Sequence, residues 1–145
     1  MFALLDANVY LSYLLAPDSQ APPSALVQMA IASEYTLLLT DGIIAEVRDK
    51  SENKPYLSDR ITQPQVERLI EILADVARHI PTIEGDLPIV GRDRKDDYLF
   101  AHALYGEADY LVSGDRGVRE IDRIRNVRIV TPAEFVAILD ARDDR

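Results

Sequence analysis

The chain has 145 residues with 48% hydrophobic and 28% charged side chains, so we expect one globular domain over residues 1–145 with a sizeable core. It contains no cysteine, which excludes disulfide bonds and thiolate metal sites. The net charge of −9 argues against broad electrostatic capture of nucleic acid, because that requires clustered lysine and arginine.

The chain opens with a short apolar run. Phe2 to Leu5 predicts a strand that is buried on both faces and ends at Asp6. The run has no basic leader and is too short for a signal peptide, and no segment reaches the roughly 20 apolar residues that span a bilayer. We therefore expect a soluble, cytoplasmic protein with no membrane partner.

Strand and helix patterns alternate along the rest of the chain. Strands are predicted at 35–40, 79–81, 110–113 and 127–130, with helices at 9–15, 22–30, 41–47, 64–76, 96–104 and 132–139. Residues 51–55 read as a polar break, 56–61 are ambiguous, and 83–93 form an irregular approach loop. This alternation predicts a mainly parallel sheet covered by helices on both faces and joined by right-handed crossovers.

Four acidic residues are predicted to meet at one edge of this sheet. Asp6 and Asp115 follow strands, Glu46 lies one turn into the helix after the second strand, and Asp97 begins a later helix. The carboxyl ends of parallel strands share an edge, where open α/β folds bind ligands. Crowded carboxylates repel one another unless a cation compensates them, and oxygen-only ligands suit Mg²⁺ or Mn²⁺. Such an ion can activate a water that attacks a phosphodiester.

Each of these residues also has a purely structural explanation. Asp6 can cap a helix, Asn8 can be a turn residue, and Glu46 can be an ordinary surface acid. Asp97 can favour a helix start through the macrodipole, and Asp115 can belong to a Gly-Asp turn. The functional interpretation depends on all four acids falling independently on the same rim.

Arginines are grouped despite the negative net charge, at 92 and 94 and again at 116, 119, 123, 125 and 128. They can be a solvated face that balances nearby acids, which is the usual role of a charge run. They can also form a local rim, together with Lys95 and including Arg116, that draws in the phosphates of a substrate.

Four segments carry a family resemblance: Leu5-Asp6-Ala-Asn8, the lone Glu46, Lys95-Asp-Asp97-Tyr-Leu-Phe-Ala101, and Ala108-Asp-Tyr-Leu-Val-Ser-Gly-Asp115. Their order and spacing resemble the PIN-domain ribonucleases, and among them the VapC-like toxins of toxin–antitoxin pairs. The resemblance covers essentially the whole chain. It implies a three-layer α/β/α sandwich, a Mg²⁺- or Mn²⁺-dependent endoribonuclease that cleaves RNA, a homodimer and an antitoxin protein partner.

Carried over residue by residue, the resemblance implies an acidic quartet of Asp6, Glu46, Asp97 and Asp115, with Asn8 and Ser113 as supporting polar residues. Asp96 is a reserve ligand. Sequence register favours Asp97, whereas helical phase aims Asp96 closer to the apolar stripe.

Two other functions stay open from the sequence. One is a haloacid-dehalogenase-like phosphatase with Asp6 as covalent nucleophile, although such enzymes have a second aspartate where Asn8 stands. The other is a PIN-like interaction module whose acids no longer bind a metal tightly.

Overall fold

The structure is a computed structural model that describes residues 1–87 and 94–143. Its centre is a six-stranded sheet in the order β3-β2-β1-β4-β6-β5. All of the described pairings are parallel except that of β5 with β6, which is antiparallel. The strands are β1 Phe2–Leu5, β2 Thr36–Thr40, β3 Arg78–Ile80, β4 Tyr110–Val112, β5 Arg123–Ile124 and β6 Val127–Val130.

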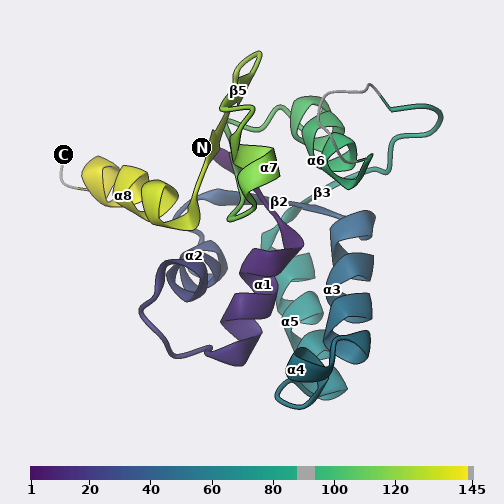
Figure 1. The fold of residues 1–145 in the computed structure, drawn as a ribbon. Helices are drawn as coiled ribbons and strands as arrows, with labels where there is room; N and C mark the ends of the chain where they lie inside the picture. Colours follow the sequence, from purple (N-terminus) through teal and green to yellow (C-terminus); the bar gives the residue numbers. More distant parts are fainter. Residues whose placement is uncertain (88–93, 144–145) are drawn as a thin grey trace.

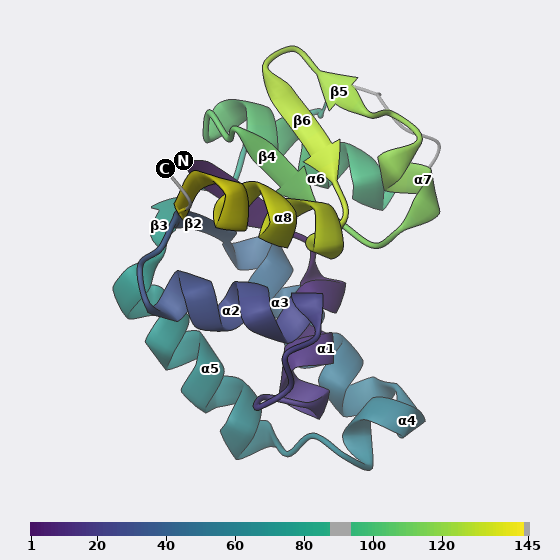
Figure 2. The same ribbon diagram turned by 90° about the vertical axis from the view of Figure 1, so that its left-hand side faces the viewer.

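Helices cover both faces of the sheet (Figures 1 and 2). Helix α6 lies on one face, and α1, α2, α3 and α5 lie on the other. The predicted α/β/α sandwich with a mainly parallel sheet is therefore confirmed. Within the described ranges, no helix is long and apolar enough to cross a membrane. The helices are α1 Ala7–Leu15, α2 Pro22–Ile31, α3 Asp41–Asn53, α4 Pro55–Ser58, α5 Gln63–Val76, α6 Arg94–Tyr105, α7 Arg116–Arg119 and α8 Pro132–Asp143.

Strand β1 is the central element of the sheet, because it pairs with β2 on one side and β4 on the other. Its residues Ala3, Leu4 and Leu5 are completely buried, as the unbroken apolar run predicts. The chain runs from β1 outward to β2 and β3, then returns to the other side of β1 to form β4. The strand order therefore reverses between β1 and β4, and this reversal is where open α/β sheets form their ligand crevice.

Helix α3 differs from its prediction at its carboxyl end. It begins after Thr40, whose side chain accepts a hydrogen bond from the Ile43 amide, and it continues to Asn53. The predicted polar break at residues 51–55 was therefore wrong except at Lys54, because residues 51–53 end α3 and Pro55 begins α4. Ser51 is buried and donates its hydroxyl hydrogen bond to the Arg48 carbonyl, so it is satisfied inside the helix.

Two buried tyrosines in the core differ in how their hydroxyl groups are satisfied. Tyr35 donates a hydrogen bond of 2.7 Å to the Leu26 carbonyl. The Tyr10 hydroxyl is buried and has no hydrogen-bond partner among the described residues. A buried donor without a partner keeps its full desolvation cost. We therefore expect the hydroxyl of Tyr10 to contribute no stabilising hydrogen bond, in contrast to that of Tyr35.

Replacing each tyrosine by phenylalanine should separate these two cases. We expect Tyr10→Phe to leave the free energy of unfolding unchanged or to raise it by up to about 1 kcal/mol, and Tyr35→Phe to lower it by about 1 kcal/mol. Urea denaturation of the two variants and the wild type measures the difference. If Tyr10→Phe lowered the free energy of unfolding as much as Tyr35→Phe, the conclusion that the Tyr10 hydroxyl has no hydrogen-bond partner would be contradicted.

Candidate functional site

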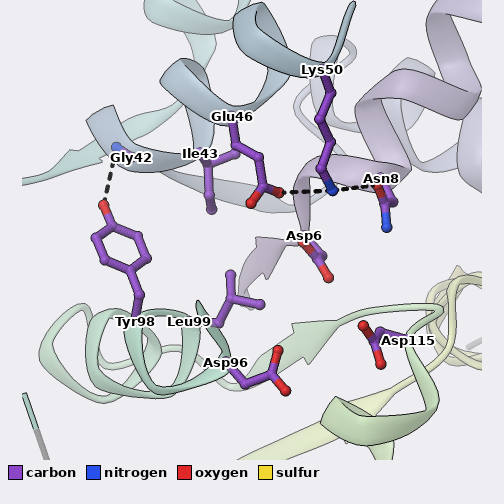
Figure 3. Close-up of a pocket in the computed structure, with 10 residues that line it drawn as sticks. All are labelled: Asp6, Asn8, Gly42, Ile43, Glu46, Lys50, Asp96, Tyr98, Leu99 and Asp115. Carbon is purple, nitrogen blue, oxygen red and sulfur yellow. Dashed lines mark hydrogen bonds and ion pairs between the residues drawn. The ribbon is translucent and has the colours of Figure 1, made fainter. Parts of the chain in front are cut away.

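A pocket of about 410 Å³ opens at the carboxyl edge of the sheet, around the reversal between β1 and β4. Its described lining brings together four acids from four separate segments: Asp6, Glu46, Asp96 and Asp115. Figure 3 shows the side chains of these acids directed toward a common space. The other described lining residues are Asn8, Gly42, Ile43, Lys50, Tyr98 and Leu99.

Ser113 connects the ends of the two central strands. Asp6 directly follows β1, and its backbone amide donates a hydrogen bond of 2.9 Å to the carbonyl of Val112, the last residue of β4. The buried Ser113 hydroxyl donates to Asp6 Oδ2 at 2.8 Å and accepts from the Asp115 backbone amide at 3.0 Å. One hydroxyl therefore fixes the Asp6 carboxylate and the turn that carries Asp115.

Asp6 is a buried carboxyl group that does not serve as a helix cap. It occupies the position before α1, but its side chain makes no capping hydrogen bond, and it is only 7% exposed. Burial raises the pKa of Asp6 above its ordinary value of 3.8, and the nearby Glu46 charge acts in the same direction. The Ser113 hydrogen bond and the charge of Lys50 lower the pKa without cancelling these effects. The folded protein thus holds Asp6 where a negative charge is costly.

Asp115 acts as a helix cap, a role that the sequence suggested for Asp6 and not for Asp115. Its Oδ1 accepts a hydrogen bond of 2.8 Å from the Gly117 amide at the start of α7. Asp96 approaches the same backbone from the other side: a Cβ on Gly117 would lie 3.3 Å from Asp115 Oδ1 and 3.6 Å from Asp96 Oδ2. The carboxylates of α6 and of the turn after β4 are therefore neighbours.

Asp96 and Asp97 are separated by the geometry of α6. Asp96 lines the pocket, whereas Asp97 is 5% exposed and is not among the described lining residues. Successive residues of a helix project about 100° apart, so two adjacent carboxylates do not face the same space. Asp96 is therefore the residue that faces the pocket, as the helical phase of this segment predicts. The sequence register favours Asp97 instead.

Glu46 faces the pocket from α3 beside a lysine four residues later. Lys50 Nζ lies 3.6 Å from Glu46 Oε2 and donates a hydrogen bond of 3.3 Å to Asn8 Oδ1 (Figure 3). Asn8 is thus linked to Glu46 through Lys50 rather than to Asp6. Sequence reasoning missed Lys50, although a glutamate four residues before a lysine is the favoured order for a helical ion pair.

Tyr98 joins α6 to the start of α3. Its hydroxyl accepts a hydrogen bond of 3.0 Å from the Gly42 amide, and its ring stacks on His102 with 3.9 Å between ring centroids. A Cβ on Gly42 would lie 2.3 Å from the Tyr98 hydroxyl oxygen, so only glycine fits there without displacing the ring. This contact sets the distance between the helices that carry Asp96 and Glu46.

His102 is held by two hydrogen bonds and does not line the pocket. Its Nε2 accepts from the Ile83 amide at 3.1 Å, so its Nδ1 carries the proton and donates to the Tyr98 carbonyl at 2.9 Å. A buried histidine with both ring nitrogens engaged in hydrogen bonds to the backbone has a structural role.

Of the two predicted phosphate-contacting residues, Arg116 is exposed in α7, directly after Asp115. The backbone of Lys95 lies in the first turn of α6, but its side chain falls outside the described part of the chain, and Arg92 lies wholly outside it. Arg119, Arg123, Arg125 and Arg128 are also exposed, on α7 and the β5–β6 hairpin.

The pocket offers the right donor atoms for a hard divalent cation, but not in a closed cluster. Its four acids provide carboxylate oxygens only, which suits Mg²⁺ or Mn²⁺. The raised pKa of Asp6 shows that positive charge near this carboxylate would be favourable. Within residues 1–87 and 94–143, however, no three histidine, aspartate or glutamate side chains are grouped closely enough to hold a metal ion.

The fold and the site together define a class of protein, namely a mainly parallel α/β/α sandwich with an acidic pocket at the carboxyl edge of its sheet. The PIN domain family model matches residues 3–117, so the chain belongs to the PIN domain family. No curated protein sequence matches the chain. The fold is similar to a chain in the crystal structure of VapBC2 from Rickettsia felis bound to a DNA fragment from their promoter. That similarity has a TM-score of 0.57 at 19% identity and covers 90% of this chain and 98% of the other.

The substitution Asp6→Asn should show the cost of the buried charge. Because the folded pKa lies above 3.8, the folded state binds the Asp6 proton more tightly, and stability falls as pH rises from 3.8 through the folded pKa. Asparagine cannot ionise, and its side-chain oxygen can still accept the Ser113 hydrogen bond. In EDTA at pH 7 we expect the variant to be more stable than the wild type, with the difference shrinking below pH 3.8. Urea denaturation at several pH values measures this, and superimposable profiles would contradict it.

The contact between Gly42 and Tyr98 can be tested by a double-mutant cycle. We expect Gly42→Ala to lower the free energy of unfolding by about 1–3 kcal/mol, because the new methyl group displaces a stacked ring. In a Tyr98→Ala background the same substitution should cost much less, because the obstructing ring is gone. Denaturant unfolding of the four proteins gives the coupling. Equal costs in both backgrounds would show that the ring does not exclude a side chain at residue 42.

Proposed function

We propose that this chain is a Mg²⁺- or Mn²⁺-dependent endoribonuclease. The observation that carries the proposal is the convergence of Asp6, Glu46, Asp96 and Asp115 on one pocket in a member of the PIN domain family. These acids come from segments up to 109 positions apart in the sequence, so their meeting is a property of the fold and not of local structure. An oxygen-only donor set at the ligand crevice of an α/β sheet supports chemistry on phosphate esters.

The four acids have distinct places in this proposal. Asp6, Asp96 and Asp115 would hold the cation, and Glu46 would complete the site from α3. Asp96 takes the position that sequence register gave to Asp97, because it lines the pocket. A bound divalent ion would neutralise charge on the phosphate and supply an activated water.

Polar neighbours would orient this machinery. Ser113 holds the Asp6 carboxylate at a fixed angle through its 2.8 Å hydrogen bond, which is the role of residues that orient metal ligands. Asn8 lies at the pocket edge beside Lys50. Arg116 and the exposed arginines of the β5–β6 hairpin offer positive charge to the substrate backbone, in a protein whose net charge of −9 otherwise repels it.

The biological role that fits best is that of the toxin in a toxin–antitoxin pair. Support comes from the fold, which is shared with a chain of the VapBC2 complex, and from the family match. On this proposal the protein acts on cytoplasmic RNA, forms a homodimer, and is controlled by an antitoxin protein partner.

Asparagine substitutions at the pocket test the nuclease. We expect Asp6→Asn and Asp115→Asn each to lower the rate of Mg²⁺-dependent RNA cleavage by about a hundredfold or more, because each removes an anionic ligand while keeping the size of the side chain. Cleavage of total RNA with Mg²⁺, and again with EDTA, measures the loss. Asp59→Asn is the control, since Asp59 is exposed beyond α4 and does not line the pocket.

The same assay distinguishes Asp96 from Asp97. Asp96→Asn should lose activity as Asp6→Asn does, with an unchanged fold by circular dichroism. Asp97→Asn should act mainly through stability, because the side chain is buried. Full activity of purified Asp6→Asn would remove the pocket from the mechanism, and a trapped aspartyl-phosphate would identify a phosphatase instead.

A further inference from the structure

A lysine of the protein itself lies among the acids that line the described part of the pocket. Among the described lining residues Lys50 is the single cation, and it shares the pocket with four carboxylates. Its Nζ lies 3.6 Å from Glu46 Oε2 and 3.3 Å from Asn8 Oδ1, and Figure 3 shows the ammonium group between them. Its charge also reaches Asp6, whose pKa is raised chiefly by burial but is lowered by Lys50.

The contacts of Lys50 are not those of a salt bridge built for stability. On the same helix, Arg48 makes two hydrogen bonds of 2.8 and 2.9 Å to Glu67, and both side chains are about half exposed. The Lys50–Glu46 pair is longer, at 3.6 Å, yet less exposed, at 24% and 30%. A long single contact contributes little to stability as an ion pair. The position of Lys50 is better explained by the negative field of the pocket as a whole.

An ammonium group in this position competes with a divalent cation. Lys50 contacts one oxygen of Glu46, Oε2, and two cations in one small pocket repel each other, so the ammonium charge opposes the binding of a metal ion there. This competition is consistent with the finding that the described acids are not already gathered into a metal-binding cluster. Without Lys50, by contrast, the four carboxylates would repel one another with no cation among the described lining residues to offset them.

We propose that Lys50 is an internal counter-ion of the pocket, which holds Glu46 and Asn8 before a divalent cation binds and weakens the binding of that cation by its own charge. This inference rests on the proposed function, since it assumes that the acids bind Mg²⁺ or Mn²⁺. On this proposal Lys50 is a positioning residue, and its charge sets the concentration of divalent cation at which the pocket becomes occupied. Helix α3 then provides this charge as well as the carboxylate of Glu46.

The test is the affinity for Mn²⁺, measured by isothermal titration calorimetry on the full chain without RNA. Lys50→Met keeps the aliphatic stem and removes the charge, and we expect it to bind Mn²⁺ about tenfold more tightly than the wild type. Lys50→Arg should stay within about threefold of the wild type, because it keeps the charge. The matched control is Lys54→Met, which removes an exposed charge from the carboxyl end of the same helix and should change the affinity by less than about twofold.

A double-mutant cycle with Glu46→Gln tests whether Lys50 acts through Glu46. If it does, the gain from Lys50→Met becomes much smaller in the Glu46→Gln background. An undiminished gain there would show that Lys50 does not act through Glu46, and unchanged or weaker Mn²⁺ binding by Lys50→Met alone would overturn the proposal. If the wild type binds Mn²⁺ and cleaves RNA while Lys50→Met shows no gain, only the present inference fails. If neither protein binds Mn²⁺, the proposed function fails with it.

Discussion

The hydroxyl group of Ser113 is the contact on which the pocket depends. It bridges the first residue after β1 and the turn after β4, at the place where the strand order of the sheet reverses. The two adjacent strands fix the backbone, and the hydroxyl fixes the direction of the Asp6 carboxylate. The sheet thereby holds Asp6 in a buried position, where the negative charge of its carboxylate is unfavourable.

The charged residues of the pocket come from the helical layers on both faces of the sheet. Asp96 reaches the pocket from α6 on one face of the sheet, and Glu46 and Lys50 reach it from α3 on the other. The contact between Gly42 and Tyr98 keeps these two layers at a fixed distance. Lys50 supplies positive charge on the same rim, beside Glu46. The pocket therefore depends both on the packing contact between Gly42 and Tyr98 and on the balance of charge around Glu46.

The sequence predicts the parts of this arrangement that follow from periodicity and strand ends. Asp6, Glu46 and Asp115 could be assigned to one rim because parallel strands share a carboxyl edge. Strand β5 was missed, because it is two residues long and forms only by pairing with β6. The choice between Asp96 and Asp97 depended on the rotation of a single helix, which a register count does not include. Lys50 was missed because ion pairs at this spacing are common on helix surfaces.

The acids of the pocket are spread along the chain from residue 6 to residue 115. During synthesis the last of them exists only once residue 115 has been made, and β4 must then still join β1. Until then the emerging segments carry acids but no assembled crevice. A chain that stops before β4 therefore lacks both Asp115 and the strand that pairs with β1 beside Asp6.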